Sequence, residues 1–417
     1  MKRKIVIILF SVAGLLMVGA AGAVAVKSWV TTPAVTVEDV LKETVRNRAT
    51  STFGFFVFPT SSQHTGTTTL LLFPTSSPRL PFTEQYINIL LLGLDSRKSA
   101  TSSHCDAIHM FTLNTASWTV QITSIPRGTH VYIPPGTFAT SQNYLANACE
   151  LAGHQYTIKQ IEKFLNKKAD YVVKVNFSQT LGILRVLKLP TTESLQWLRN
   201  RKSFAIGDPQ RSHNQAVFMK DVALRKIGVF KNIVMLPVAR IAYSYSDTNL
   251  KFDAFYALLR GYAESDLDKH PERITLSMWP SHKTGDFHFD FKNPEAFVSK
   301  FRIVTSATSS TATPIRPLSS VQSELIAYLK QRLASKWSIT DVLQKQLWLQ
   351  IDNEKTREEF HFAFLERQLK ETKSYADKME ILNNYIFEKE VLELPEWADK
   401  GKALLQSIAS ASSSTVP

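Results

Sequence analysis

The chain has 417 residues, of which 44% are hydrophobic and 20% charged. This composition excludes a wholly disordered protein and favours two or three folded domains. The formal net charge is +13, and residues 1–320 carry the excess, with 36 basic and 21 acidic residues. Such a field attracts an anionic partner, whether a phosphate, a nucleic acid or a membrane surface.

The chain contains two cysteines, Cys105 and Cys149. Two thiols exclude a four-cysteine zinc site and a disulfide framework of several bridges. We expect both to be free and buried as small hydrophobic side chains. A Cys105–Cys149 disulfide is the alternative if the domain lies outside the cytoplasm.

The N-terminal 27 residues have the pattern of a membrane anchor. Met1-Lys2-Arg3-Lys4 precedes 22 uncharged residues, Ile5 to Val26. This length spans a bilayer as a helix, and the basic cluster keeps the N-terminus in the cytoplasm. A cleaved signal peptide is the alternative, since Ala21-Gly22-Ala23 fits a cleavage pattern. Either way, we expect the main domain to be extracytoplasmic.

A Ser/Thr/Pro-rich stretch follows, in which Phe58-Pro59-Thr60-Ser61-Ser62 recurs at residues 73–77. We expect residues 28–83 to be a low-complexity spacer.

Three apolar runs with polar ends come next. The first, Ile87–Leu92, is followed by Gly93-Leu94-Asp95-Ser96-Arg97, which predicts a buried parallel strand opening onto a charged loop. The second, Ala107–Leu113, is entered through His104-Cys105-Asp106. The third, Thr119–Ile125, ends in Pro126-Arg127. Since ligands bind at strand ends in open α/β sheets, we expect a shared site there. The residues presented are Asp95, Arg97, Asp106 and Arg127.

Strand and helix patterns then alternate to residue 304, which predicts a layered α/β domain with helices on both faces of its sheet, over residues 84–304. The expected strands are Thr129–Ile133, Asp170–Phe177, Arg273–Met278 and Phe287–Phe291. The expected helices are Tyr144–Ala152, Thr157–Leu165, Ser178–Leu187, Glu193–Arg199, Ser212–Lys226 and Leu250–Tyr262.

The C-terminal part has a different composition. Residues 305–320 are rich in Ser, Thr and Pro and predict a linker. Residues 321–417 show apolar positions three and four residues apart, which predicts a helical module. Its expected helices are Val321–Leu349, Glu354–Tyr375, Ala376–Val391 and Trp397–Ala411. It carries no catalytic constellation, and a protein partner on 321–417 is the interaction hypothesis.

A fourth polar cluster lies between the predicted helices of residues 193–226. Arginines bind phosphate oxygens in a bidentate manner, so several of them around one site favour a pyrophosphate. Mg²⁺ would explain the carboxylates nearby, because it takes one or two carboxylates together with phosphate oxygens. The alternative is a set of surface ion pairs, Asp95 with Arg97 and Asp208 with Arg211. The residues of this cluster are Arg199, Arg201, Asp208, Arg211 and Gln215.

Other chemistries lack their motifs. Neither a Gly-x-Gly-x-x-Gly nor a Gly-x-x-x-x-Gly-Lys-Ser/Thr loop follows the first strand, and there is no Gly-x-Ser-x-Gly elbow. This disfavours dinucleotide oxidoreduction, P-loop hydrolysis and serine esterase chemistry. The histidines at 104, 109, 130 and 154 lack metal-ligand spacing, so we expect them in loops or in packing.

In this order the motifs resemble the LytR-CpsA-Psr (LCP) family over about Ile87 to Lys226. The first strand with its Gly-Leu-Asp-Ser-Arg end resembles that family's first motif. Further similar segments are Ser124-Ile125-Pro126-Arg127, Leu145-Ala146-Asn147-Ala148, the strand Ala169–Phe177, and Leu198-Arg199-Asn200-Arg201 through Asp208, Arg211 and Gln215.

The resemblance implies an extracytoplasmic phosphotransferase. Such an enzyme moves a glycopolymer from a polyprenyl-pyrophosphate carrier to a cell-wall hydroxyl, usually of peptidoglycan, with Mg²⁺. Asp106 and Asp95 would hold the metal, and Asp95 is alternatively the base. The pyrophosphate would be held by Arg97, Arg127, Arg201, Arg211 and Gln215, with Arg199 and Asp208 alongside.

Three positions depart from the family pattern. His104 and Asn214 stand where the family has arginines, and Gly128 stands where it has an aspartate. The rival hypothesis is therefore a non-catalytic polyprenyl-phosphate binder or envelope scaffold of the same fold. Nothing resembles a nucleic-acid recognition helix, so we expect no nucleic-acid partner.

Overall fold

The computed structural model describes residues 85–95, 103–134, 140–308 and 318–413. The predicted membrane helix, the spacer and Arg97 lie outside these residues. Within them, no helix is both long and apolar enough to span a membrane.

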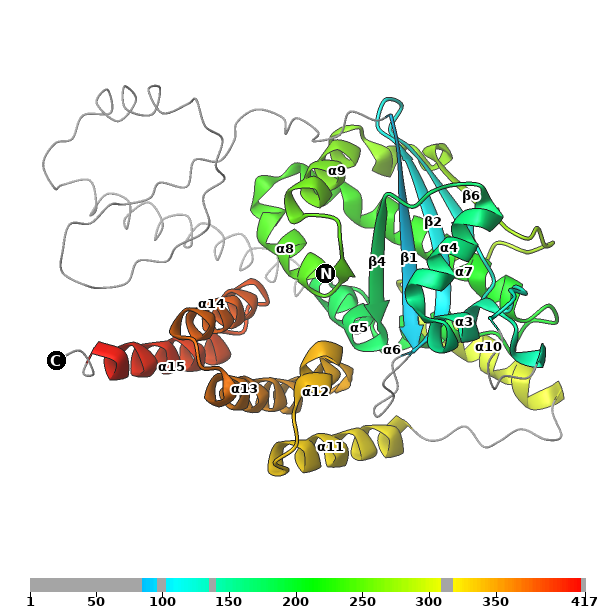
Figure 1. The fold of residues 1–417 in the computed structure, drawn as a ribbon. Helices are drawn as coiled ribbons and strands as arrows, with labels where there is room; N and C mark the ends of the chain where they lie inside the picture. The colour runs from blue at the N-terminus through cyan, green and yellow to red at the C-terminus, as the bar shows by residue number, and fades with distance from the viewer. Residues whose placement is uncertain (1–84, 96–102, 135–139, 309–317, 414–417) are drawn as a thin grey trace, which may run out of the picture. The chain divides into compact units, whose positions relative to one another are not determined.

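A six-stranded mixed sheet forms the centre of the domain, in the order β5-β4-β1-β2-β3-β6 (Figure 1). β1 is parallel to β4 but antiparallel to β2, so the predicted parallel pairing holds on one side of β1. This arrangement brings the end of β1, the start of β2 and the end of β3 to one edge of the sheet. The strands are β1 Tyr86–Asp95, β2 His104–Asn114, β3 Thr119–Ser124, β4 Tyr171–Asn176, β5 Asp247–Thr248 and β6 Ile274–Met278.

Helices cover both faces of the sheet, as predicted. On one face, Leu90, Leu92 and Ile108 are buried against α3 (Leu145–Leu151) and α4 (Gly153–Leu165). On the other, Ile87 and Ile122 pack against α7 (Asp208–Lys226) and α9 (Phe252–Glu264). Successive strand residues point to opposite faces, so one apolar run supplies both cores.

Helix α5 (Phe177–Val186) begins at a capping box. The Asn176 side chain accepts a hydrogen bond from the Gln179 amide, and the Gln179 side chain accepts one from the Asn176 amide. The box satisfies two backbone donors that a helix start leaves without partners. It turns the chain sharply from β4 into α5.

Helix α7 begins four residues before the predicted Ser212, at Asp208. Gly207 ahead of it has φ +62°, a conformation that favours glycine, and Pro209 lies in the first turn, where its missing N–H costs nothing. The remaining elements of this part are α6 Thr192–Arg199, α8 Leu236–Ser244, α10 Pro294–Thr308, and the 3₁₀ helices Thr140–Gln142, Ile227–Lys231, Ile233–Met235, Leu267–Lys269 and Pro271–Arg273.

Two predicted strands are wrong. Within Thr129–Ile133, only His130 forms an isolated bridge, to Tyr144. Phe287–Phe291 joins no ladder. Its three phenylalanines pack into an aromatic cluster with Trp197 and Phe218, so side-chain packing produced an alternation that resembles that of a strand.

The C-terminal helices share a core with the sheet domain. Val186 of α5 and Tyr245, which follows α8, are buried together with Leu329, Trp348 and Phe364. The predicted first helix, Val321–Leu349, is broken into three segments. The elements are α11 Leu318–Ala334, α12 Thr340–Lys345, the 3₁₀ helix Leu347–Gln350 (η6), α13 Glu354–Glu371, α14 Tyr375–Val391 and α15 Pro395–Ser413.

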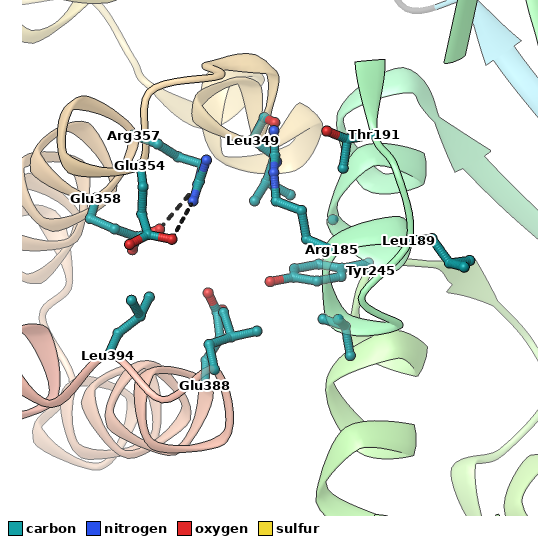
Figure 2. A pocket seen from close by; sticks show the side chains of 13 residues that line it. Arg185, Leu189, Thr191, Tyr245, Leu349, Glu354, Arg357, Glu358, Glu388 and Leu394 are labelled. Carbon is teal, nitrogen blue, oxygen red and sulfur yellow. Dashed lines mark hydrogen bonds and ion pairs between the residues drawn. The ribbon is translucent and has the colours of Figure 1, made fainter. Parts of the chain in front are cut away.

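The seam between α5, α8 and the C-terminal helices contains a pocket of about 370 Å³ that is lined by both charged and apolar residues. Figure 2 shows Arg185 and Tyr245 on one side, facing Arg357, Glu358 and Glu388 on the other. Arg185 donates to the carbonyls of Leu349 and Ile351 at the end of η6. Burial, followed by repulsion from Arg357, lowers its pKa to about 10.

Candidate active site

Asp106 and Arg127 meet at the edge shared by β1, β2 and β3. Between Gly93 and Leu94 the register shifts, because Gly93 pairs with Ala107 and Leu94 with Cys105. Asp106 is therefore the extra residue of a β-bulge, a feature that redirects a side chain. Its carboxylate accepts a hydrogen bond from the Arg127 guanidinium.

The first turn of α7 completes the cluster. Arg211 lies 2.6 Å from the Asp208 carboxylate and donates to the Asp106 carbonyl at 3.0 Å. The Arg127 Nε lies 3.5 Å from the same Asp208 oxygen, and the Gly128 amide donates to the other oxygen at 3.3 Å. Positive and negative side chains thus alternate along a chain of contacts, from Asp106 through Arg127 and Asp208 to Arg211. The segments that supply them are about 80 residues apart in the sequence.

The cluster lies between solvent and core. Arg211 is 4% exposed, whereas Asp106, Asp208 and Arg127 are 17–21% exposed. Burial lowers the pKa of the Arg211 guanidinium from its ordinary value. Asp208 opposes this shift, while the positive charges of Arg127 and Arg201 add to it. Arg201 is therefore close enough to act on this cluster, and its own side chain is exposed.

The other predicted site residues have separate positions. Asp95 ends β1, opposite His104 of β2. The Arg199 guanidinium lies over the Phe177 ring, 4.6 Å from its centroid. Gln215 is buried, and its amide contacts the His109 ring and donates to the Leu198 carbonyl. In the structure, the Gln215 amide is thus occupied by protein contacts.

His109 was not singled out from the sequence as a support of the site. It is fully buried, 3.1 Å from the Ser124 hydroxyl and 3.2 Å from the Gln215 amide oxygen. Burial lowers its pKa to about 4, so the ring is neutral at neutral pH. The predicted packing role is confirmed for this histidine. The signal in the sequence is a histidine inside the apolar run of β2, since a buried imidazole requires a polar partner such as Gln215.

The expectation of free cysteines is wrong, because Cys105 and Cys149 form a disulfide. Docking of α3 onto the start of β2 brings their Cα atoms to 5.8 Å, within the range that a disulfide bridges. In the described ranges, the group of metal-ligating types that lies within coordination distance is Cys105, Cys149 and His154. Its two sulfurs are consumed by the disulfide.

The carboxylates of the edge are oxygen donors, the ligand type that a hard cation such as Mg²⁺ takes. Hard cations take oxygen ligands, and Mg²⁺ needs one or two carboxylates once phosphate oxygens and waters supply the rest. Asp106 and Asp95, at the start of β2 and the end of β1, are donors of this kind.

Comparison with known proteins gives a consistent result. Residues 73–181 match the model of the LytR_cpsA_psr family. The predicted family resemblance is confirmed for this segment. The chain is 24% identical over 201 residues to the polyisoprenyl-teichoic acid–peptidoglycan teichoic acid transferase TagU of Bacillus licheniformis, covering 43% of this chain and 64% of that protein. It thus spans less than two thirds of that relative.

A second relative is the teichoic acid transferase TagT of Bacillus subtilis, 32% identical over 95 residues, or 22% of this chain and 28% of TagT. Among solved structures, B. subtilis TagV has a TM-score of 0.40 at 19% identity, covering 55% of this chain and all of TagV. TagT bound to LIIa-WTA has a TM-score of 0.36 at 17% identity, covering 54% and 92% of the two chains.

Proposed function

We propose that this protein is a membrane-anchored, extracytoplasmic phosphotransferase that moves a glycopolymer from a polyprenyl-pyrophosphate carrier to a hydroxyl of peptidoglycan. The supporting observation is the convergence of Arg127 and Arg211 with Asp106 and Asp208 at one sheet edge. The relatives named as teichoic acid transferases support the reaction class.

The net charge of the cluster indicates how much additional positive charge binding of the pyrophosphate carrier requires. Two arginines and two aspartates sum to zero, so the four side chains alone give little net attraction for a pyrophosphate. Arg201 adds one positive charge nearby. When bound at Asp106 and Asp95, Mg²⁺ would supply charge neutralisation of the phosphate oxygens.

In the proposed reaction, the acceptor hydroxyl attacks the phosphorus attached to the glycan, and the bond from that phosphorus to the bridging oxygen breaks. Polyprenyl phosphate leaves with the bonding electrons. Arg127 and Arg211 hold the phosphate oxygens as charge moves onto the leaving oxygen, which is the main work of a protein in phosphoryl transfer. Asp95, at the end of β1, would be the base for the hydroxyl proton if it does not bind the metal.

The test is Mg²⁺-dependent transfer by the full chain, with Arg127→Ala as the variant. Loss of one group that stabilises transition-state charge lowers kcat by about 10²–10³-fold. Arg240→Ala is the matched control, because Arg240 is exposed and lies over the Phe252 ring. Equal turnover by wild type and Arg127→Ala would refute the assignment.

A non-catalytic polyprenyl-phosphate binder or envelope scaffold is the second candidate. It is favoured by His104, which stands where the resemblance implies an arginine and lies 2.9 Å from Glu150. Tight binding of the polyprenyl-pyrophosphate glycan without turnover, in the same assay with Mg²⁺ present, would support this candidate. A protein partner on residues 321–417 belongs to this hypothesis.

A further inference from the structure

Asp106 makes both of its site contacts because it is bulged out of the β1–β2 ladder. Its side chain accepts from Arg127, and its carbonyl accepts from Arg211 at 3.0 Å. A bulged residue has no partner in the neighbouring strand, so the ladder does not fix its position. Other contacts must hold it for the site geometry to persist.

Two cross-links lie directly before the bulge. Cys105 is joined to Cys149 by the disulfide, and both are buried. The His104 Nδ1 lies 2.9 Å from the Glu150 carboxylate. Consecutive residues of β2 are thereby fastened to consecutive residues near the end of α3. We call these two links the β2–α3 clasp.

The opposite end of α3 is bound to the segment that carries Arg127. The Ala146 amide donates to the Arg127 carbonyl and the Leu145 amide to the Thr129 carbonyl, both at 3.0 Å. Helix α3 therefore bridges the two partners of the Asp106–Arg127 pair. The contacts form a closed ring that runs through the clasp, α3 and the Arg127 backbone back to Asp106.

We propose that the β2–α3 clasp is a positioning device that sets Asp106 against Arg127 and Arg211. Its consequence for transfer rests on the proposed function, whereas its effect on the bulge does not. Because misplacing a reacting group by about 1 Å costs on the order of 10²-fold in rate, loosening the bulge should lower kcat more than it changes the donor KM.

The test compares full-length wild type with Cys105→Ala/Cys149→Ala and with His104→Gln, which leaves the disulfide intact. Amide hydrogen exchange of residues 103–108 reports the bulge directly. Mn²⁺ binding, followed by the resonance of the free ion, and the kcat and KM of transfer report the site. Glu264→Gln is the control, because it removes the Arg260–Glu264 ion pair of α9, outside the ring.

For the double alanine variant we expect exchange in residues 103–108 to rise about tenfold, Mn²⁺ to bind roughly fivefold more weakly, and kcat to fall about tenfold at nearly constant KM. His104→Gln should show the same changes at smaller size, since the His104–Glu150 contact is partly exposed. If the double variant fails to fold, His104→Gln alone decides the outcome by the same readouts.

If the variants exchange amide hydrogens and bind Mn²⁺ as wild type does, the proposal is refuted, even if their turnover falls. Faster exchange in the variants, together with unchanged Mn²⁺ binding and turnover in Asp106→Asn, would instead support the clasp and reject the role of Asp106 in the proposed function. Failure of the clasp proposal can thus be distinguished from failure of the proposed function.

Discussion

Replacement of Lys389 by methionine should strongly destabilise the C-terminal helices. Lys389 lies on α14 and is 1% exposed. Its ammonium is 2.6 Å from Glu358, 2.8 Å from Glu388 and 2.9 Å from the His361 Nδ1. Burial, followed by the Lys389 charge, holds the pKa of His361 well below its ordinary value, so the imidazole is neutral and accepts. The ammonium therefore hydrogen-bonds to Glu388 and His361 and forms an ion pair with Glu358.

The magnitude follows from what the substitution leaves behind. The methionine side chain would fill a similar volume, but Glu358, which is 3% exposed, would retain only Arg357 as a close cation among the described residues, at 3.2 Å. Removing one partner of a buried ion pair costs about 3–5 kcal/mol, because the other charge stays buried with one counter-charge fewer beside it. Lys402→Met is the control, since its pair with Glu390 is 42–47% exposed and worth about 0–1 kcal/mol.

Urea unfolding of the full chain measures this difference, followed by far-ultraviolet circular dichroism and tryptophan fluorescence. Trp348 stacks on the His361 ring, with centroids 4.6 Å apart, and so reports the network locally. Adding Glu358→Met to Lys389→Met should recover at least half of the loss, because the carboxylate most deeply buried beside Lys389 is then removed as well. A free energy of unfolding for Lys389→Met within about 1 kcal/mol of that for Lys402→Met would refute this reasoning.

Two further predictions concern the sheet. The pKa of His109 is about 4 in the folded protein and 6.5 in the unfolded chain. Between these pH values the unfolded chain binds one proton more, so the free energy of unfolding should rise by roughly 3 kcal/mol as pH increases from 4 to 6.5. A stability difference between wild type and His109→Gln that stays constant across this window would contradict the prediction. A Cβ on Gly93 would lie 2.8 Å from the Ala107 Cβ, so Gly93→Ala should cost about 1–3 kcal/mol by overpacking. Gly128→Ala, with nothing within 4 Å of its Cβ, is the control, and equal melting temperatures would exclude the clash.

The strands that carry the site were predictable because burial demands apolar residues. The runs that became β1, β2 and β3 stop where side chains meet solvent at the sheet edge, so Asp106 and Arg127 could be placed there from sequence. The start of α7 was predicted four residues late, although Gly207 and Pro209 are ordinary signals of a helix start.

The bulge and the disulfide were not predictable in the same way. A bulge is a property of the register between two strands, and no local pattern in β1 or β2 fixes that register. Pairing of Cys105 with Cys149 depends on how α3 docks against β2 across 44 residues of chain. The strand predicted at Phe287–Phe291 was wrong for the opposite reason. The alternating aromatic side chains of this segment pack into a hydrophobic cluster, although its backbone pairs with no strand among the described residues.

Each of the three departures from the family pattern contacts a neighbouring residue of the chain. His104 pairs with Glu150 of α3, the Gly128 amide donates to Asp208, and the buried Asn214 accepts from the Gln210 amide at 2.8 Å. A Cβ at position 128 would have nothing within 4 Å, and the contact with Asp208 is made by the backbone amide. Asp208 itself links Arg127 with Arg211. Phosphate recognition at this edge would therefore rest on Arg127 and Arg211, which pair with the Asp106 and Asp208 carboxylates.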